Sequence, residues 1–206
     1  MGDMTASPSV VSALAMTLAS LSYDFADDEL AYLTLTSRGG VPVRDRISWR
    51  LQQELDETYV VARGWRRADI AVLARDTPVL QVATRALPAP DVLDPGARAE
   101  HVAALVADGL RMTSVAPDSS AYLLALMTHV DGTVPDHLAE HVVKHAVDTV
   151  SAGDDDTSVA DRARKLWEAE LGRFGWPSTR FTVGGGSLWG LAVEMDAYLI
   201  GPLPQA

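Results

Sequence analysis

The sequence contains no cysteine among its 206 residues. This absence excludes disulfide bonds, thiolate ligands for zinc and a cysteine nucleophile in one step. It is compatible with a reducing compartment, and we expect a cytoplasmic protein. Low-complexity stretches of the kind found in disordered chains are also missing. Because 48% of the residues are hydrophobic, the chain is long and apolar enough to bury a full core.

Positive charge is scarce, since 17 basic residues stand against 28 acidic ones and the formal net charge is -11. Such a balance disfavours a protein that coats nucleic acid through bulk electrostatics, so any nucleic-acid contact must be local. No basic residue precedes the apolar run from Val10 to Leu21, and Ser12, Thr17 and Ser20 interrupt that run. It therefore fits neither a signal peptide nor a membrane span, and we expect no membrane partner.

Apolar residues at helical spacing predict three helices before the first strand, at residues 8–21, 27–36 and 42–56. Ser7 and Pro8 suit the beginning of the first helix, because serine can cap it and proline is preset for its first turn. Residues 59–63 are expected to form a strand.

The stretch from Arg67 to Leu87 predicts a β-hairpin that is buried on both faces. Residues 68–74 form a near-continuous apolar run, Arg75, Asp76 and Thr77 supply turn chemistry, and a second run extends through Arg85. Asp69 is the one acid in the first run. An unpaired carboxylate inside a sheet is costly, so Asp69 needs a cation, a donor or a solvated cleft.

The rest of the chain alternates again between helix and strand. Asp94 and Pro95 can begin a helix that runs to about Met112, and its inward residues are expected to be Val102, Leu105, Val106 and Leu110. The following elements are a buried strand at 121–130, a helix at 136–150, a solvated linker at 151–157, a helix at 158–174 and two strands at 179–183 and 188–200.

The second strand of the hairpin reads Pro78-Val79-Leu80-Gln81-Val82-Ala83-Thr84-Arg85-Ala86. It resembles the P-V-x-L-V-E-x-K-A strand of the PD-(D/E)XK, or restriction-endonuclease-like, nucleases, and Asp69 matches the acid that this family carries on the preceding strand. The resemblance spans residues 38–130. It implies an α/β fold with an αβββαβ core and a mixed sheet, in one domain over 1–206, with N-terminal helices at 8–37 and a C-terminal helix plus β-hairpin elaboration at 131–206.

The same resemblance implies a degenerate active site. Asp69, Gln81 and Arg85 would be its remnants, because Ala83 stands at the position of the second acid and Arg85 at that of the lysine. Sites of this family need at least two carboxylates to hold a divalent metal, so we expect no metal and no cofactor. Magnesium would enter only if other acids had taken over, and the candidates are Glu54, Asp56, Glu57 and Asp76. In the alternative, structural interpretation, Asp69 pairs with Arg85 or Arg67.

Arginine is concentrated in and before the hairpin, where Arg44, Arg46, Arg50, Arg63, Arg66, Arg67, Arg75 and Arg85 supply 8 of the 17 basic residues. If the first six converge, they form a phosphate-facing surface that could bind nucleic acid. The alternative is that they neutralise the nearby acids Asp45, Glu54, Asp56 and Glu57.

Two further patterns carry weaker signals. His137, His141 and His145 recur at helical spacing, but the pattern is not HExxH and is more typical of solvated histidines than of a metal site. Gly184–Gly186 and Gly190 lack the following Lys-Ser or Lys-Thr of a phosphate-binding loop, which favours a flexible hairpin turn.

These patterns together predict a catalytically degenerate nuclease-like protein that serves as a binding or regulatory component in nucleic-acid processing or defence. Two alternatives stay open: a metal-dependent DNA endonuclease with relocated acidic ligands, and a protein-interaction module on a nuclease scaffold. The expected partner is nucleic acid or another protein, and the oligomeric state is left open.

Overall fold

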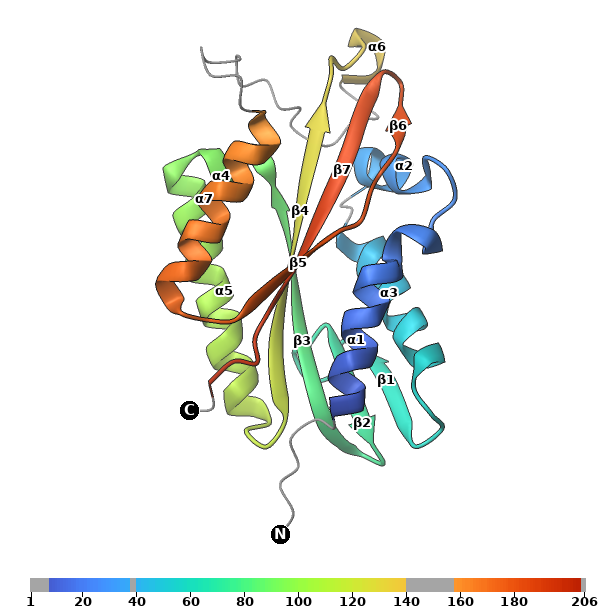
Figure 1. Cartoon of the computed structure of the whole chain (residues 1–206), viewed down its shortest axis with the longest axis vertical. Coiled ribbons are helices and arrows are strands. Elements are labelled where there is room, and N and C mark those ends of the chain that lie inside the picture. Colours follow the sequence, from blue (N-terminus) through green and yellow to red (C-terminus); the bar gives the residue numbers. More distant parts are fainter. Residues whose placement is uncertain (1–7, 38–39, 140–157, 205–206) are drawn as a thin grey trace.

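A computed structural model describes residues 8–37, 40–139 and 158–204, and shows an α/β protein in which helices cover both faces of one open sheet (Figure 1). The strands are β1 (Tyr59–Arg63), β2 (Ile70–Ala74), β3 (Thr77–Pro88), β4 (Ser120–Asp131), β5 (Ser178–Thr182), β6 (Ser187–Leu188) and β7 (Leu191–Ile200). The helices are α1 (Pro8–Ser20), the 3-10 helix η1 (Leu21–Asp24), α2 (Glu29–Thr36), α3 (Gly40–Glu54), α4 (Ala89–Leu93), α5 (Pro95–Val115), α6 (Asp136–Ala139) and α7 (Val159–Phe174).

The sheet has the strand order β1-β2-β3-β4-β7-β5, and β6 pairs with β7. β3 and β4 are parallel, and the other pairs are antiparallel. Parallel neighbours require a crossover connection, which α4 and α5 supply here. From α3 to β4 the chain therefore follows the predicted αβββαβ order, apart from the short additional helix α4, in a mixed sheet.

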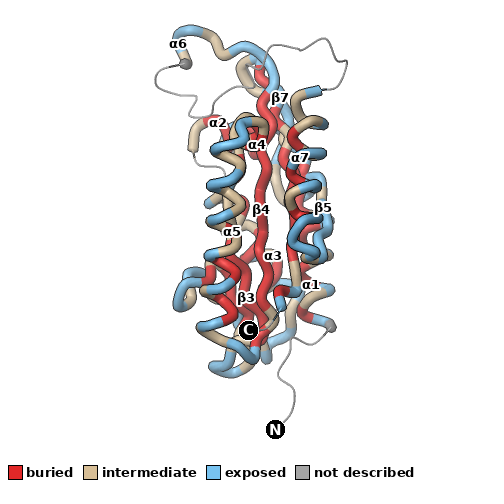
Figure 2. The backbone as a smooth tube through the Cα atoms, turned by 90° about the vertical axis from the view of Figure 1, so that its left-hand side faces the viewer, coloured by how far each residue is buried: buried red, intermediate tan, exposed pale blue. Residues whose placement is uncertain are grey.

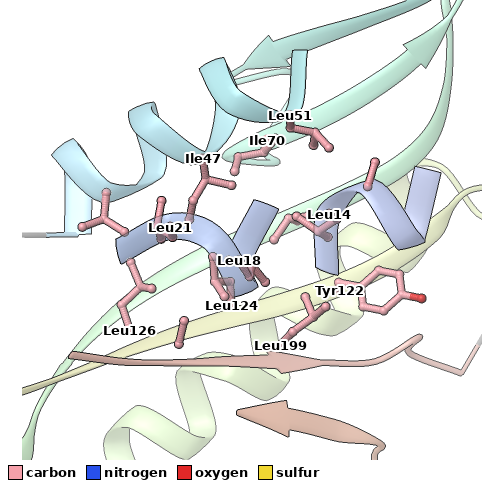
Figure 3. Packing of buried hydrophobic residues seen from close by; sticks show 14 of the residues in the cluster. Leu14, Leu18, Leu21, Ile47, Leu51, Ile70, Tyr122, Leu124, Leu126 and Leu199 are labelled. Carbon is pink, nitrogen blue, oxygen red and sulfur yellow. The ribbon is translucent and has the colours of Figure 1, made fainter. Parts of the chain in front are cut away.

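One face of the sheet is covered by α1 and α3. Leu14, Leu18 and Leu21 are fully buried, and Figure 3 shows them between Ile47 and Leu51 of α3 and the residues of the central strands. This packing explains the apolar spacing of the first predicted helix, which faces the core along its whole length.

The opposite face is covered by α4, α5 and α7, whose main buried residues include Leu105, Met112 and Trp167. β4 lies between the two helix layers and is buried from Ala121 to Val130 (Figure 2). An apolar run without alternation is what a strand buried on both faces requires, so the prediction for 121–130 is confirmed.

The orientation of α5 differs from the prediction in one respect. Leu110 is 66% exposed, whereas Asp108 and Met112 are buried. Asp108 faces inward because it forms ion pairs with Arg85 of β3 and Arg111. A rotation of α5 that buried Leu110 would turn Asp108 away from the sheet and leave Arg85 without its carboxylate partner.

The predicted strand at 188–200 is interrupted by a tight turn. Trp189 and Gly190 both have positive φ, at 55° and 79°, and they join β6 to β7. Two consecutive residues of this kind suit the two-residue hairpin turns that match the twist of antiparallel strands. Of the predicted helix at 136–150, α6 is described, while the remainder, the linker at 151–157 and the residues His141 and His145 lie outside the described residues.

No single described helix is long and apolar enough to cross a membrane. The segments Ser9–Asp24 and Glu29–Thr36 meet the length and composition requirements only as a pair, and they are bent by 96° relative to each other.

Candidate functional site

Asp69 lies one residue before β2 and extends its pairing with β3. Its backbone N–H donates to the carbonyl oxygen of Val82 at 3.0 Å, and its Oδ2 accepts from the backbone N–H of Thr84 at 2.7 Å. Its Oδ1 lies 3.4 Å from Nη1 of Arg44 on α3. The carboxylate thus replaces a backbone acceptor at the end of the hairpin and is partly neutralised by one guanidinium.

Gln81, Ala83 and Arg85 lie on the face of β3 that packs against α5. Nη2 of Arg85 is 2.6 Å from Oδ2 of Asp108, and Nε2 of Gln81 donates to Oγ of Ser119 at 2.6 Å. Ala83 is 2% exposed in the same core. The three residues share a face as strand alternation requires. The structural interpretation paired Asp69 with Arg85 or Arg67. Asp69 instead pairs with Arg44 of α3, and Arg85 pairs with Asp108.

The four acids that were candidates for a relocated metal site lie at the other end of the hairpin. Asp56 and Glu57 precede Tyr59, which pairs with Ala74 beside the turn that holds Asp76. Glu54 follows Arg44 by ten residues on α3, about 15 Å along the helix. Among the described residues, no group of three or more histidine, aspartate or glutamate side chains could hold a metal ion.

Four arginines and two aspartates gather at the turn between β1 and β2. We call this set the arginine corner, and it consists of Arg44, Arg63, Arg66, Arg67, Asp45 and Asp69. Asp45 pairs with both Arg44 and Arg63, at 3.0 Å each. The four arginines and two aspartates give the arginine corner a formal charge of plus two, on a protein that is acidic as a whole.

The turn itself carries an exposed guanidinium on an aromatic ring. The Arg66 guanidinium lies 4.7 Å from the centre of the Trp65 ring, and both Arg66 and Arg67 are exposed. Their backbone φ angles are 50° and 155°, in a region that residues other than glycine rarely adopt. Within the described parts of the chain neither arginine forms an ion pair, so both are available to a ligand.

Arg46 and Arg50 do not join this corner. Arg46 pairs with Glu29 at 3.0 Å and lies over the Phe25 ring at 4.8 Å, while Arg50 pairs with Glu54 at 3.1 Å on the same helix. Arg50 is therefore neutralised by Glu54, one of the acids that the sequence analysis named, whereas Arg46 is neutralised by Glu29, which was not among them. Asp45, also named, neutralises part of the charge of Arg44 and Arg63.

The glycine-rich segment packs closely against the N-terminal region. A Cβ atom on Gly185 would overlap the carbonyl oxygen of Val193, and one on Gly186 would overlap Oδ1 of Asp28. Asp28 also accepts a hydrogen bond from the backbone N–H of Ser187 at 2.7 Å. The glycines are thus explained by close approach of the backbone, and an acid occupies the position where a phosphate loop would hold an anion.

A second polar cluster, which the sequence analysis did not identify, lies where β4 and β7 face α7. Nε2 of His129 is 3.1 Å from Oδ2 of Asp196, and Nε of Arg164 donates to the same oxygen at 2.6 Å. Thr182 donates to Oδ1 of Asp196 at 3.1 Å, and Arg164 also binds Glu194. His129 and Asp196 are buried titratable residues in largely apolar strands, a signal similar to the one that singled out Asp69.

Asp196 is completely buried, yet its carboxyl is held in the ionised form. Burial raises the pKa of this carboxyl, but the hydrogen bonds and charges of His129 and Arg164 outweigh burial and leave the pKa below the usual value. Burial lowers the pKa of the Arg164 guanidinium, and Asp196 and Asp161 more than reverse that effect. The two residues therefore form a charged pair in the interior.

His129, Arg164 and Glu194 of this cluster border a cavity of about 510 Å³ together with Asp131 and Asp161. The volume lies within the range of small-molecule sites.

Protein-family models, curated proteins and solved structures were each compared with the chain, and none of these comparisons gives a match. The fold and the geometry of the two polar sites are therefore the basis for inferring function.

Proposed function

We propose that the chain is a catalytically inactive relative of the PD-(D/E)XK nucleases that binds nucleic acid through the arginine corner. Two observations support the relationship. The elements follow the αβββαβ order with a parallel β3–β4 pair, and Asp69 lies beside β3, the strand whose sequence resembles the family's motif strand. In this proposal the scaffold serves binding or regulation in nucleic-acid processing or defence.

Loss of hydrolysis follows from the chemistry of the motif residues. Ala83 supplies no metal ligand, and Arg85 is bound to Asp108 on the far side of the strand from α3. Both oxygens of Asp69 already have partners, the Thr84 amide and Arg44. A divalent ion needs several oxygen ligands, and one partly neutralised carboxylate does not hold it.

The observation that carries the binding proposal is the pair of exposed arginines beside Trp65, neither of which forms an ion pair with any residue that the structure describes. Guanidinium groups bind phosphates through paired hydrogen bonds, and an aromatic ring offers a surface on which a base can stack. The corner is positive while the whole chain is acidic, so contact with a polyanion is confined to this end of the sheet.

The test is fluorescence anisotropy with labelled single-stranded and double-stranded oligonucleotides at several salt concentrations. Arg66→Glu with Arg67→Glu is expected to weaken binding by about tenfold or more and to reduce the slope of log affinity against log salt by about two, one for each lost phosphate contact. The same oligonucleotides are expected to stay intact with magnesium or manganese.

Lys165→Glu with Arg173→Glu is the matched control, because it changes the charge equally at exposed positions of α7. An equal loss of affinity in the control would show that only bulk charge matters. Cleavage that disappears in Asp69→Ala would contradict the inactive site.

A protein partner is the second candidate function, favoured by Trp49. This side chain is 63% exposed and borders a cavity of about 340 Å³ next to Val61 and Arg63, beside the edge strand β1. Exposed aromatic residues beside a sheet edge are typical of protein-binding surfaces. No nucleic-acid binding at low salt would favour this function over the first.

A further inference from the structure

The outer edge of strand β1 is occupied by a side chain of α3. β1 stands at one end of the strand order, and in the described parts of the chain no other strand pairs with its outer side (Figure 1). The side-chain amide of Gln52 lies there instead. Its Nε2 donates to the carbonyl oxygen of Tyr59 at 3.2 Å, and its Oε1 accepts from the backbone N–H of Val61 at 2.7 Å. An added strand would use the same two backbone groups, so Gln52 stands in its place.

Of the two edges of the sheet, β1 is the more apolar one. Its sequence is YVVAR, in which four aromatic or aliphatic residues precede Arg63, and Val60 is 55% exposed. The strand at the opposite end of the order, β5, reads STRFT. Polar and charged residues protect an edge strand against pairing with another chain, whereas an apolar edge favours such pairing. The edge that holds Gln52 is therefore the one with the weaker protection in its own sequence.

The Gln52 amide covers only part of this edge. Backbone groups alternate in direction along a strand, so those of Arg63 face outward like those of Tyr59 and Val61. The next residue fits this alternation, because the N–H of Gly64 donates to the carbonyl oxygen of Asp69, on the inner side. An added strand centred on Val61 would reach all three outward-facing residues.

The charges at the two ends of β1 identify the partner that fits this edge. Asp56 and Glu57 precede the strand, and both are exposed. Arg66 and Arg67 follow it, and both are exposed. When two copies of β1 pair antiparallel around Val61, the acidic end of each lies against the basic end of the other, which is favourable. A parallel pair would place like charges together.

We propose that the outer edge of β1 is a pairing surface for a second copy of this chain, and that the Gln52 amide keeps it closed in the monomer. Pairing requires the amide to leave, because it occupies the carbonyl of Tyr59 and the N–H of Val61. The same surface serves both copies around a two-fold axis, so the product is a closed dimer. The proposal depends neither on nucleic-acid binding nor on a different protein partner.

Sedimentation equilibrium of the whole chain at low salt measures the self-association of the wild type and of Gln52→Ala. The wild type is expected to stay monomeric. The variant is expected to dimerise with an association constant at least about tenfold higher, because two competing hydrogen bonds are gone. It is expected to unfold cooperatively like the wild type, since the freed backbone groups lie at the surface and can bind water.

Gln53→Ala is the matched control, because Gln53 is the adjacent glutamine on α3 and is exposed. This control is expected to sediment like the wild type. Amide hydrogen exchange then locates the contact. In Gln52→Ala, the N–H groups of Val61 and Arg63 are expected to exchange at least about tenfold more slowly at dimer-forming concentrations than in the dilute monomer.

A charge reversal tests the orientation of the two strands. Added to Gln52→Ala, Glu57→Lys is expected to weaken the dimer by about threefold or more, because it places a cation against the arginines of the other copy. Glu100→Lys is the control for net charge, since Glu100 is an exposed acid of α5. It is expected to leave the dimer of Gln52→Ala unchanged.

The proposal is overturned if Gln52→Ala stays monomeric at millimolar concentration, or if the wild type or Gln53→Ala associates as strongly. Slower exchange of the β5 amides in place of those of β1 would put the contact at the other edge and would also overturn it. A series of larger species would exclude the two-fold surface. Equal effects of Glu57→Lys and Glu100→Lys would contradict the antiparallel pairing.

Discussion

Asp69, His129 and Asp196 are polar residues in or beside apolar strands, and each has a partner on another element. Asp69 meets Arg44 of α3, and Asp196 meets both His129 of β4 and Arg164 of α7. The difference lies in their environment: Asp69 is 34% exposed at the side chain, whereas Asp196 is fully buried. Surface pairs contribute little to stability, but breaking a buried pair leaves an uncompensated charge.

Replacing Asp196 by asparagine is therefore expected to destabilise the fold by about 3–5 kcal/mol at neutral pH. The pKa of the carboxyl is lower in the folded protein than its usual value of 3.8, so ionised Asp196 stabilises the fold above that pH. This contribution is lost as the pH falls below 3.8 and through the lower folded pKa. Urea unfolding measures the free energy of unfolding of the wild type and of Asp196→Asn. The difference between the two values should be largest at pH 7 and should decrease in acid, and a difference that does not depend on pH would contradict this role.

At the scale of elements, α5 shows how one ion pair sets the rotation of a helix. Its apolar residues alone predicted that Leu110 faces the core, yet Asp108 is turned inward by Arg85. Gly109 lies beside it, where an added Cβ would come within 3.1 Å of Leu203. The helix thus contacts the sheet through a charge, a glycine and Met112 rather than through Leu110.

This orientation predicts that alanine substitutions of two apolar residues of α5 differ strongly in their effect on the free energy of unfolding. Leu110→Ala should change the free energy of unfolding by less than about 0.5 kcal/mol, because the side chain is 66% exposed. Met112→Ala should cost about 2–5 kcal/mol, because it leaves a cavity next to β3 and β4. Chemical denaturation of both variants measures the difference, and similar losses would show that Leu110 packs inward.

At the scale of the whole molecule, the segment after residue 131 completes the sheet. β7 forms nine residue pairs with β4 and separates it from β5, and Trp167 of α7 is fully buried. The segment from α3 to β4 thus shares its central strand and both hydrophobic layers with the C-terminal region.

A chain that ends at Asp131 is consequently expected not to fold. It would expose the edge of β4 and the apolar side chains of Leu123, Ala125 and Met127 that α7 and β7 help to cover. We expect a non-cooperative thermal transition and strong binding of a hydrophobic dye, while the full chain unfolds cooperatively. A cooperative transition in the shortened chain would mean that the C-terminal region is a separate addition.

The sequence by itself determined the long elements, because each depends on local chemistry, but not the short helix α4 or the break between β6 and β7. Helical spacing marked α1 and α3, Asp94 caps α5 as predicted, and the apolar run at 121–130 marked a strand buried on both faces. Of the candidate site, it identified the motif residues of β3 and part of the arginine corner.

Only the tertiary structure decided which charges meet. Asp69 finds Arg44, Arg85 finds Asp108, and Asp196 joins His129 and Arg164 across separations of 25, 23, 67 and 32 residues. These pairs depend on strand order and helix rotation, which the burial of many residues sets together and no local pattern encodes. For the same reason the cavity beside α7 became visible only when β7 was placed next to β4.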